Sequence, residues 1–163
     1  MITRDRLVEV LDYDQETGHF TWKQTMGGRA IKGQKAGTRH SKGYTRITID
    51  QEQYFAHRLA WLYVNGEMPK QSTVDHIDGD PSNDRIANLR EATFADNLAN
   101  RGPQSNNTSG CKGAWFDKRT QRWSADIWRH GKKHSLGRFD DKYKASDAYA
   151  AAAVRLAGEF WRR

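Results

Sequence analysis

Residues 74–97 bring acidic, imidazole and amide side chains together at wide but defined separations. An apolar run that ends in Asp75 and His76 predicts a strand that delivers a carboxylate beside an imidazole. A Gly-Asp-Pro turn then reverses the chain, so that Asn88 is predicted in a returning strand and Asn97 on the helix that follows. A carboxylate and an amide oxygen suit a hard divalent cation that keeps open positions for water and a phosphate oxygen. His76, beside such an ion, could take a proton from the attacking water.

Simpler interpretations of this segment stay open. Asp and Asn side chains often hydrogen-bond to their own backbone, which is the default interpretation of the acidic and amide residues from 78 to 84. A calcium loop fits poorly, because the run lacks a Gly at the sixth place and a Glu at the twelfth. His57, on an apolar helix, is interpreted as a scaffold hydrogen-bonding residue in preference to a catalytic one.

Hydrophobic periodicity and turn residues predict the helices and strands that must position these side chains. Together these elements form an α+β fold in two modules. The first module, residues 1–103, begins with a strand-rich extension and is predicted to contain a helix at 3–12, strands at 19–23, 44–50 and 53–56, and helices at 56–64 and 94–100. Small polar residues at 104–111 predict a linker. Residues 112–163 predict strands at 113–118, 122–128 and 132–139 and a helix at 142–160, which together form a three-stranded antiparallel sheet covered by one helix.

The formal net charge of +7 is distributed unevenly along the 163 residues. Residues 1–105 carry 14 Lys and Arg against 14 Asp and Glu, whereas residues 106–163 carry 13 against 6. Such asymmetry is typical of a segment that binds a polyanion, although a merely basic soluble surface is the alternative. Within the first module, residues 29–46 carry six basic side chains and no acidic one, so this loop could contact phosphates or simply be solvated.

The single cysteine, Cys111, excludes an internal disulfide framework and a Cys-rich zinc site. It favours a reducing compartment. No apolar run has the length of a membrane-spanning helix, and the first residues differ from a signal peptide. We therefore expect a cytoplasmic protein with no membrane partner.

The segment from 57 to 101 resembles the HNH nuclease family, in the subgroup of phage and intron homing endonucleases. The matching strings are His57-Arg58-Leu59-Ala60-Trp61, Val74-Asp75-His76-Ile77-Asp78-Gly79, Asn88-Leu89-Arg90 and Asn97. The resemblance implies a ββα-metal fold in which His76 is the general base, Asp75 and Asn97 are metal ligands, and Asn88 holds the His-bearing loop. Asn in place of the third family-naming residue makes this an H-N-N variant. The amide of this Asn favours magnesium or manganese over zinc, because an amide is a weaker ligand than imidazole for borderline metals.

Residues 112–160 resemble the plant ethylene-response-factor type of DNA-binding domain. The matching strings are Lys112-Gly113-Ala114-Trp115, Arg122-Trp123-Ser124-Ala125-Asp126-Ile127, Leu136-Gly137-Arg138-Phe139 and Tyr149-Ala150-Ala151-Ala152. In that fold the sheet enters the major groove, and period-two alternation then predicts which side chains face DNA. The predicted DNA-facing residues are Lys112, Trp115, Arg122, Ser124, Asp126, Trp128, Lys133, Ser135 and Arg138. Trp115 and Asp117 stand where the plant domains tend to carry arginines, so a plant-type target sequence cannot be assumed.

The resulting hypothesis is a metal-dependent endonuclease, encoded by a phage or bacterium, that hydrolyses phosphodiester bonds in double-stranded DNA. One active site in each chain favours nicking, and either a monomer or a homodimer is compatible with the sequence. The main alternative is a sequence-specific DNA-binding regulator with a decayed nuclease site, although a regulator has no need of all four motif residues. An RNA-binding structural protein fits less well, because the predicted sheet lacks a base-stacking pattern.

Overall fold

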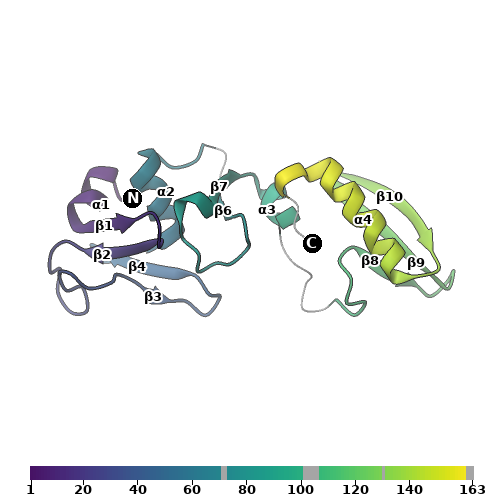
Figure 1. Cartoon of the computed structure of the whole chain (residues 1–163), viewed down its shortest axis with the longest axis horizontal. Coiled ribbons are helices and arrows are strands. Elements are labelled where there is room, and N and C mark those ends of the chain that lie inside the picture. The colour runs from purple at the N-terminus through teal and green to yellow at the C-terminus, as the bar shows by residue number, and fades with distance from the viewer. Residues whose placement is uncertain (71–72, 101–106, 130, 161–163) are drawn as a thin grey trace. The chain divides into compact units, whose positions relative to one another are not determined.

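The computed structural model describes residues 1–70, 73–100, 107–129 and 131–160 (Figure 1). Backbone contacts divide the chain into two compact units, Met1–Ala92 and Thr93–Arg163. Both units combine helices with small antiparallel sheets, so the α+β class is confirmed. The division between the two units falls before the helix at 94–100. The sequence predicts a module boundary after this helix, near residue 103. The predicted boundary stays a prediction. None of the helices in the described ranges is both long and apolar enough to cross a membrane.

The first unit opens with a short helix and a hairpin. Helix α1, Arg4–Val10, begins at Thr3, whose hydroxyl accepts a hydrogen bond from the Arg6 amide. The sequence predicted a helix as far as residue 12, and this was wrong at the C-terminal end: strand β1, Leu11–Asp14, pairs with β2, His19–Trp22. The reason is the burial pattern, because alternate residues of β1 point into the core, which a strand permits and a helix does not.

The rest of this unit's core forms between a small sheet and a helix. Strands β3, Thr38–Arg39, β4, Thr45–Ile49, and β5, Glu52–Phe55, form an antiparallel sheet in that order. Helix α2, Ala56–Asn65, follows β5 directly and ends at Gly66 in the left-handed conformation. The largest fully buried side chains all belong to this unit and are Phe20, Leu7, Leu11, Ile47, Ile49, Leu59 and Val10.

The predicted functional motif occupies a second hairpin of the first unit. Strand β6, Thr73–His76, pairs with β7, Leu89–Ala92, so that Asp75 lies opposite Arg90 and His76 opposite Leu89. Between them lies a loop that ends in a short 3-10 helix, η1, Ile86–Asn88. Asn88 was predicted in the returning strand, whereas it is the last residue of η1, because strand pairing begins only at Leu89.

The second unit begins with a capped helix. Helix α3, Phe94–Asn100, follows Thr93, whose hydroxyl accepts from the Asp96 amide while the Asp96 carboxylate accepts from the Thr93 amide. This reciprocal pair satisfies amide groups that have no partner inside the first turn. Thr93 therefore caps the N-terminus of α3.

The predicted sheet and covering helix follow in the second unit. Strands β8, Ala114–Asp117, β9, Arg122–Arg129, and β10, Lys132–Phe139, form an antiparallel sheet in the order β10-β9-β8. Helix α4, Lys142–Ala157, packs on all three strands and is followed by η2, Gly158–Phe160. The core is built mainly of alanines, so the backbones approach closely. A side chain at Gly113, where φ is +76°, would come within 2.5 Å of the Tyr149 ring, so only glycine fits there.

Residues 107–111, part of the predicted linker, form a hydrogen-bonded turn. The Asn107 side chain accepts from the amides of Ser109 and Gly110 and donates to the Cys111 carbonyl. Cys111 is buried against Ala114, Ala125 and Ala145, so this end of the segment belongs to the second unit. Residues 104–106 of the predicted linker lie outside the described residues.

Candidate active site and DNA-binding face

His76, the predicted general base, is turned into the first unit and is 5% exposed. Its Nε2 atom lies 3.1 Å from Oδ1 of Asp84, which is 3% exposed. A carboxylate that accepts from one imidazole nitrogen fixes the ring's orientation and stabilises the protonated ring. Sequence reasoning had assigned Asp84 to an ordinary polar turn, so this partner was missed.

The backbone of Asp84 is fixed by the N-terminal hairpin. Tyr13 in β1 donates its hydroxyl to the Asp84 carbonyl at 2.7 Å. The turn between β1 and β2 packs against the same segment, because a Cβ atom at Gly18 would lie 2.6 Å from the Arg85 nitrogen and 2.7 Å from the Asp84 carbonyl carbon. Gly18 also has a φ of +73°, so both sterics and backbone conformation require glycine there. The strand-rich extension therefore positions the residue that contacts His76.

His57 joins this group from helix α2. Its ring centroid lies 4.9 Å from that of His76, and its Nδ1 atom is buried without a hydrogen-bond partner among the described residues. Burial, together with the nearby His76 and Arg58, lowers the pKa of His57 to about 3, so its ring is neutral at physiological pH. One donor atom from each of His57, His76 and Asp84 lies within 4.8 Å of the others. No spacing in the chain predicts this cluster, because only the packing of α2 against β6 brings His57 to His76.

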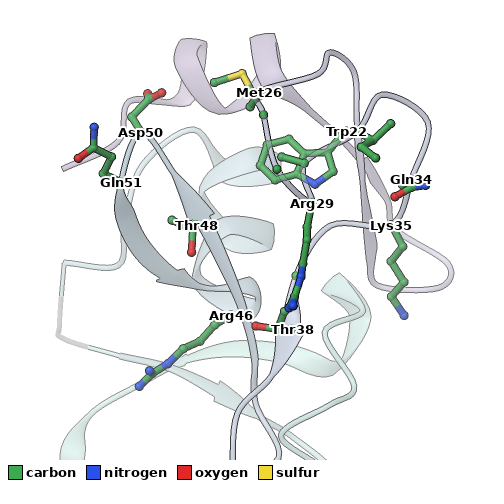
Figure 2. A pocket seen from close by; sticks show the side chains of 15 residues that line it. Trp22, Met26, Arg29, Gln34, Lys35, Thr38, Arg46, Thr48, Asp50 and Gln51 are labelled. Carbon is green, nitrogen blue, oxygen red and sulfur yellow. The ribbon is translucent and has the colours of Figure 1, made fainter.

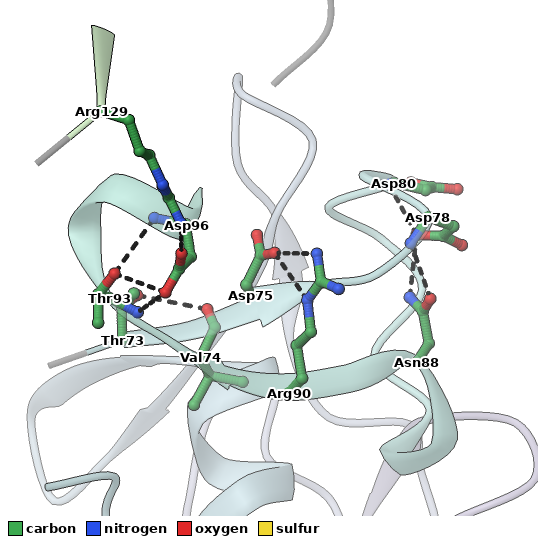
Figure 3. A network of polar contacts seen from close by, with 10 residues as sticks. All are labelled: Thr73, Val74, Asp75, Asp78, Asp80, Asn88, Arg90, Thr93, Asp96 and Arg129. Carbon is green, nitrogen blue, oxygen red and sulfur yellow. Dashed lines mark hydrogen bonds and ion pairs between the residues drawn. The ribbon is translucent and has the colours of Figure 1, made fainter. Parts of the chain in front are cut away.

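Asp75, the predicted metal ligand on strand β6, is also buried. Figure 3 shows its carboxylate facing the Arg90 guanidinium across the β6–β7 pair. Its Oδ2 atom accepts from Arg90 Nε at 3.3 Å and from Nη2 at 3.1 Å. A cation is thus already paired with this carboxylate, and a metal ion would have to share Asp75 with Arg90 or displace it.

Asn88 ties the loop that follows His76 to its far end (Figure 3). Its Oδ1 accepts from the Asp78 amide at 3.1 Å, and its Nδ2 donates to Asp78 Oδ1 and to the Asn83 carbonyl, each at 2.9 Å. Partial burial acts to raise the pKa of Asp78, but hydrogen bonds from Asn83, the Asp80 amide and Asn88 outweigh it and lower this pKa. Asn88 therefore lies where a loop-holding residue is needed, whereas its importance for activity stays a prediction.

Asn97, the other predicted metal ligand, lies on α3 in the second unit and is partly buried. Its neighbour Asp96 forms an ion pair with Arg129 of β9, which attaches α3 to the sheet of the same unit (Figure 3). Asp75 and Asn97 thus belong to different units, and their sharing of one metal ion stays a prediction.

The register of the second unit places the predicted DNA-facing strand residues on one face of the sheet. Ser124 lies between Trp115 and Arg138, and Trp128 lies opposite Lys133, so their side chains share a face. The helix-facing side carries Ala125 and Ile127, which are buried under α4.

Polar contacts already organise this face. Asp126 accepts from Trp115 Nε1 at 3.2 Å and pairs with Lys133 at 3.1 Å. Arg122 pairs with Asp140 at 2.9 Å in an exposed ion pair, which is worth little in stability and can be exchanged for a phosphate. Ser124 is only 5% exposed beneath its long neighbours, so a DNA contact by its hydroxyl requires those side chains to move.

Lys112 lies just before strand β8, outside the paired register, and is partly buried. Its carbonyl accepts from the Ser146 hydroxyl of α4 at 3.0 Å, so the backbone of Lys112 is fixed to the covering helix. Ser135 lies opposite Asp126 and is exposed, at the point where the register of β10 shifts before Gly137.

The basic loop of the first unit lines a cavity of about 860 Å³ (Figure 2). Arg29, Lys35 and Arg46 contribute to its wall, and its one lining carboxylate, Asp50, is paired with Arg6 at 2.9 Å. The cavity is therefore positively charged overall. A positively charged cavity is compatible with phosphate contacts by residues 29–46, one of the two interpretations of this loop that the sequence leaves open.

Comparison with known proteins identifies both parts of the chain. The family model described as HNH endonuclease matches residues 54–99, which include β6, the His-bearing loop and β7. Protein 3.8 of Escherichia phage T7 is 39% identical over 80 residues, which is 49% of this chain and 66% of the phage protein. An uncharacterised HNH endonuclease of Acanthamoeba polyphaga mimivirus is 28% identical over 115 residues, covering 70% of this chain and 59% of that protein. The chain therefore carries an HNH endonuclease domain, the class of nuclease that the resemblance predicted.

The C-terminal part is similar to a second class of protein. An AP2-like ethylene-responsive transcription factor of Arabidopsis thaliana is 45% identical over 58 residues, which is 36% of this chain and 12% of the plant protein. The second module is thus of the AP2 type. The chain spans about two thirds or less of each of these relatives. No solved structure matches significantly.

Proposed function

We propose that the chain is a divalent-metal-dependent DNA endonuclease that nicks one strand of a duplex. The observation that carries the proposal is the hydrogen bond between His76 and Asp84, with the candidate ligand Asp75 adjacent to His76 in β6 and the loop after His76 held by Asn88. The segment therefore supplies an oriented base and a hard oxygen ligand, as phosphodiester hydrolysis requires.

The protein's own groups would move the proton. In the neutral tautomer that donates from Nε2 to Asp84, the lone pair of His76 is on Nδ1, and this atom accepts the proton of the attacking water. Asp84 then stabilises the imidazolium that forms. Since His76 is buried, access of water to Nδ1 requires side chains around the ring to move when DNA binds, while Asp84 stays in contact with Nε2.

The oxygen donors of Asp75 and Asn97 fit a hard ion such as Mg²⁺ or Mn²⁺. Because Asp75 is already paired with Arg90, such an ion would share this carboxylate with Arg90 or displace it. When bound, such an ion would offset negative charge on the phosphate and on the departing oxygen. Arg90 would remain near the phosphate after releasing Asp75 and so contribute charge of its own.

The AP2-type module would hold the enzyme on double-stranded DNA, with the basic cavity of the first unit contacting the backbone elsewhere. With one active site in each chain, a monomer would nick one strand, whereas a homodimer could cut both strands. The phage relative and the single cysteine support a cytoplasmic location in a bacterial or phage-infected cell.

A regulator with a decayed nuclease site is the second candidate. Its supporting observation is that Asp75, the proposed metal ligand, is buried and already paired with Arg90. Incubation of the purified full chain with supercoiled plasmid separates the two candidates. The nuclease converts supercoils to nicked circles with Mg²⁺ or Mn²⁺ and stops when EDTA is added, whereas the regulator leaves the plasmid supercoiled although it binds.

The DNA-binding face has its own prediction. Replacing Arg122 and Arg138 together with Gln is expected to weaken DNA binding and to reduce the slope of log K against log salt by about 2, roughly 0.9 for each lost phosphate contact. The measurement is a set of fluorescence-anisotropy titrations between low and physiological salt. Replacing Lys118 and Arg119, exposed in the β8–β9 turn away from the paired strands, is the matched control. An unchanged slope in the first variant would place the contacts on another surface.

A further inference from the structure

We propose that His57, His76 and Asp84 form a second metal site in the first unit, one that takes a borderline divalent ion such as Zn²⁺. We further propose that occupation of this site withdraws His76 from proton transfer and so inhibits the nuclease. The binding part of the proposal stands independently, whereas the inhibition rests on the proposed function.

The geometry of the three side chains is close to that of a bound ion. Ligand atoms about 2.0–2.1 Å from a tetrahedral zinc lie roughly 3.4 Å from one another. His76 Nε2 and Asp84 Oδ1 are already 3.1 Å apart, and one donor atom of His57 completes a set within 4.8 Å. Closing the set therefore needs the donor atoms to approach by up to about 1.4 Å, from 4.8 Å to the separation of roughly 3.4 Å in a tetrahedral site.

The hydrogen bonding of His57 also suits a metal ligand. An imidazole nitrogen that binds a cation offers its lone pair to the metal ion and needs no other partner. The buried Nδ1 of His57 has no hydrogen-bond partner among the described residues, which is rare for a buried polar atom. A metal ion bound by this nitrogen would supply the missing partner.

The donor types separate this site from the one assigned to Asp75 and Asn97. Two imidazoles and a carboxylate favour zinc, cobalt or nickel, whereas carboxylate and amide oxygens favour magnesium or manganese. The hairpin contacts to Asp84 and the position of His57 on α2 hold the set from three separate elements. Softer ions would thus select the buried set and harder ions the oxygen set.

Titration of the full chain with Co²⁺ tests the binding part without any need for activity. The expected result is one equivalent bound with the visible absorption of tetrahedral Co²⁺, and displacement by Zn²⁺. Asp84→Asn and His57→Gln are expected to weaken this binding at least tenfold. Asp75→Asn is the matched control and is expected to keep it. Circular dichroism verifies the fold of each variant. If His57→Gln unfolds, the nearly isosteric Asp84→Asn variant tests the site in its place.

The outcomes separate the possibilities. Absence of the Co²⁺ spectrum, or its loss in Asp75→Asn with retention in Asp84→Asn, overturns the site. With the site present, Zn²⁺ at one equivalent is expected to lower Mg²⁺-supported nicking at least tenfold, and EDTA followed by excess Mg²⁺ is expected to restore it. Co²⁺ binding without inhibition by Zn²⁺ overturns the inhibitory role. A chain that binds Co²⁺ as expected but never nicks DNA supports the site while overturning the proposed function.

Discussion

Replacing His76 with Ala is expected to lower the rate of plasmid nicking by about 10²–10⁴-fold and to leave DNA affinity unchanged. The rate falls because His76, oriented by Asp84, is the proposed base that takes the proton from water. The affinity is retained because the DNA-binding face belongs to the other unit. Single-turnover nicking and anisotropy titrations measure the two quantities separately.

Because His76 is buried, the alanine variant also leaves a cavity and some loss of stability must be separated from loss of chemistry. His76→Gln fills much of the volume and should be equally inactive. His19→Ala, at an exposed histidine of β2, is the matched control and should cleave normally. If folded His76→Ala protein nicks DNA at the normal rate, another group is the general base.

Asp84 is expected to act as a positioning residue for His76. Asp84→Ala should reduce the maximal nicking rate by roughly 10–100-fold, the usual effect of losing the partner of a functional histidine. Asp84→Asn keeps an oxygen acceptor but loses the negative charge, so an intermediate reduction is expected. The effect should appear in kcat, with little change in KM, because DNA contacts are not altered.

A merely structural role for Asp84 would predict a different pattern. Nitrogen NMR of the His76 ring reports which nitrogen carries the proton, and in the wild type this should be Nε2. Loss of that preference in Asp84→Ala, with unchanged melting behaviour, supports positioning. An unaltered ring signal, together with a rate that recovers when the variant is stabilised by lower temperature, would assign Asp84 to the scaffold.

Much of the fold was predictable because its signals are local. Helix α2 was predicted at 56–64 and lies at Ala56–Asn65, and the three strands of the second unit lie within about one residue of their predicted bounds. The helix at 3–12 was too long because Leu11 satisfies both helical and strand periodicity. Only the pairing of β1 with β2, a tertiary contact, decides between them.

The candidate site was likewise predictable where its signals are local and not where tertiary packing decides. Asp75, His76 and Asn88 could be singled out because their types and spacing form a motif in the chain. The partnership of Asp84 with His76, and the approach of His57, depend on side-chain packing that no spacing encodes. The burial of Ser124 beneath Trp115 and Arg138 likewise follows from the lengths of its cross-strand neighbours.

The contact from Tyr13 to the Asp84 carbonyl has a consequence for how this nuclease can be recombined with other proteins. The two residues are 71 positions apart, and Tyr13 lies outside the 54–99 segment that defines the family. A graft of that segment alone would carry the motif residues but leave Asp84 without its hydroxyl donor and without the close packing at Gly18. The smallest transferable nuclease therefore has to include the first hairpin, and natural shuffling of this domain would have to exchange the two together.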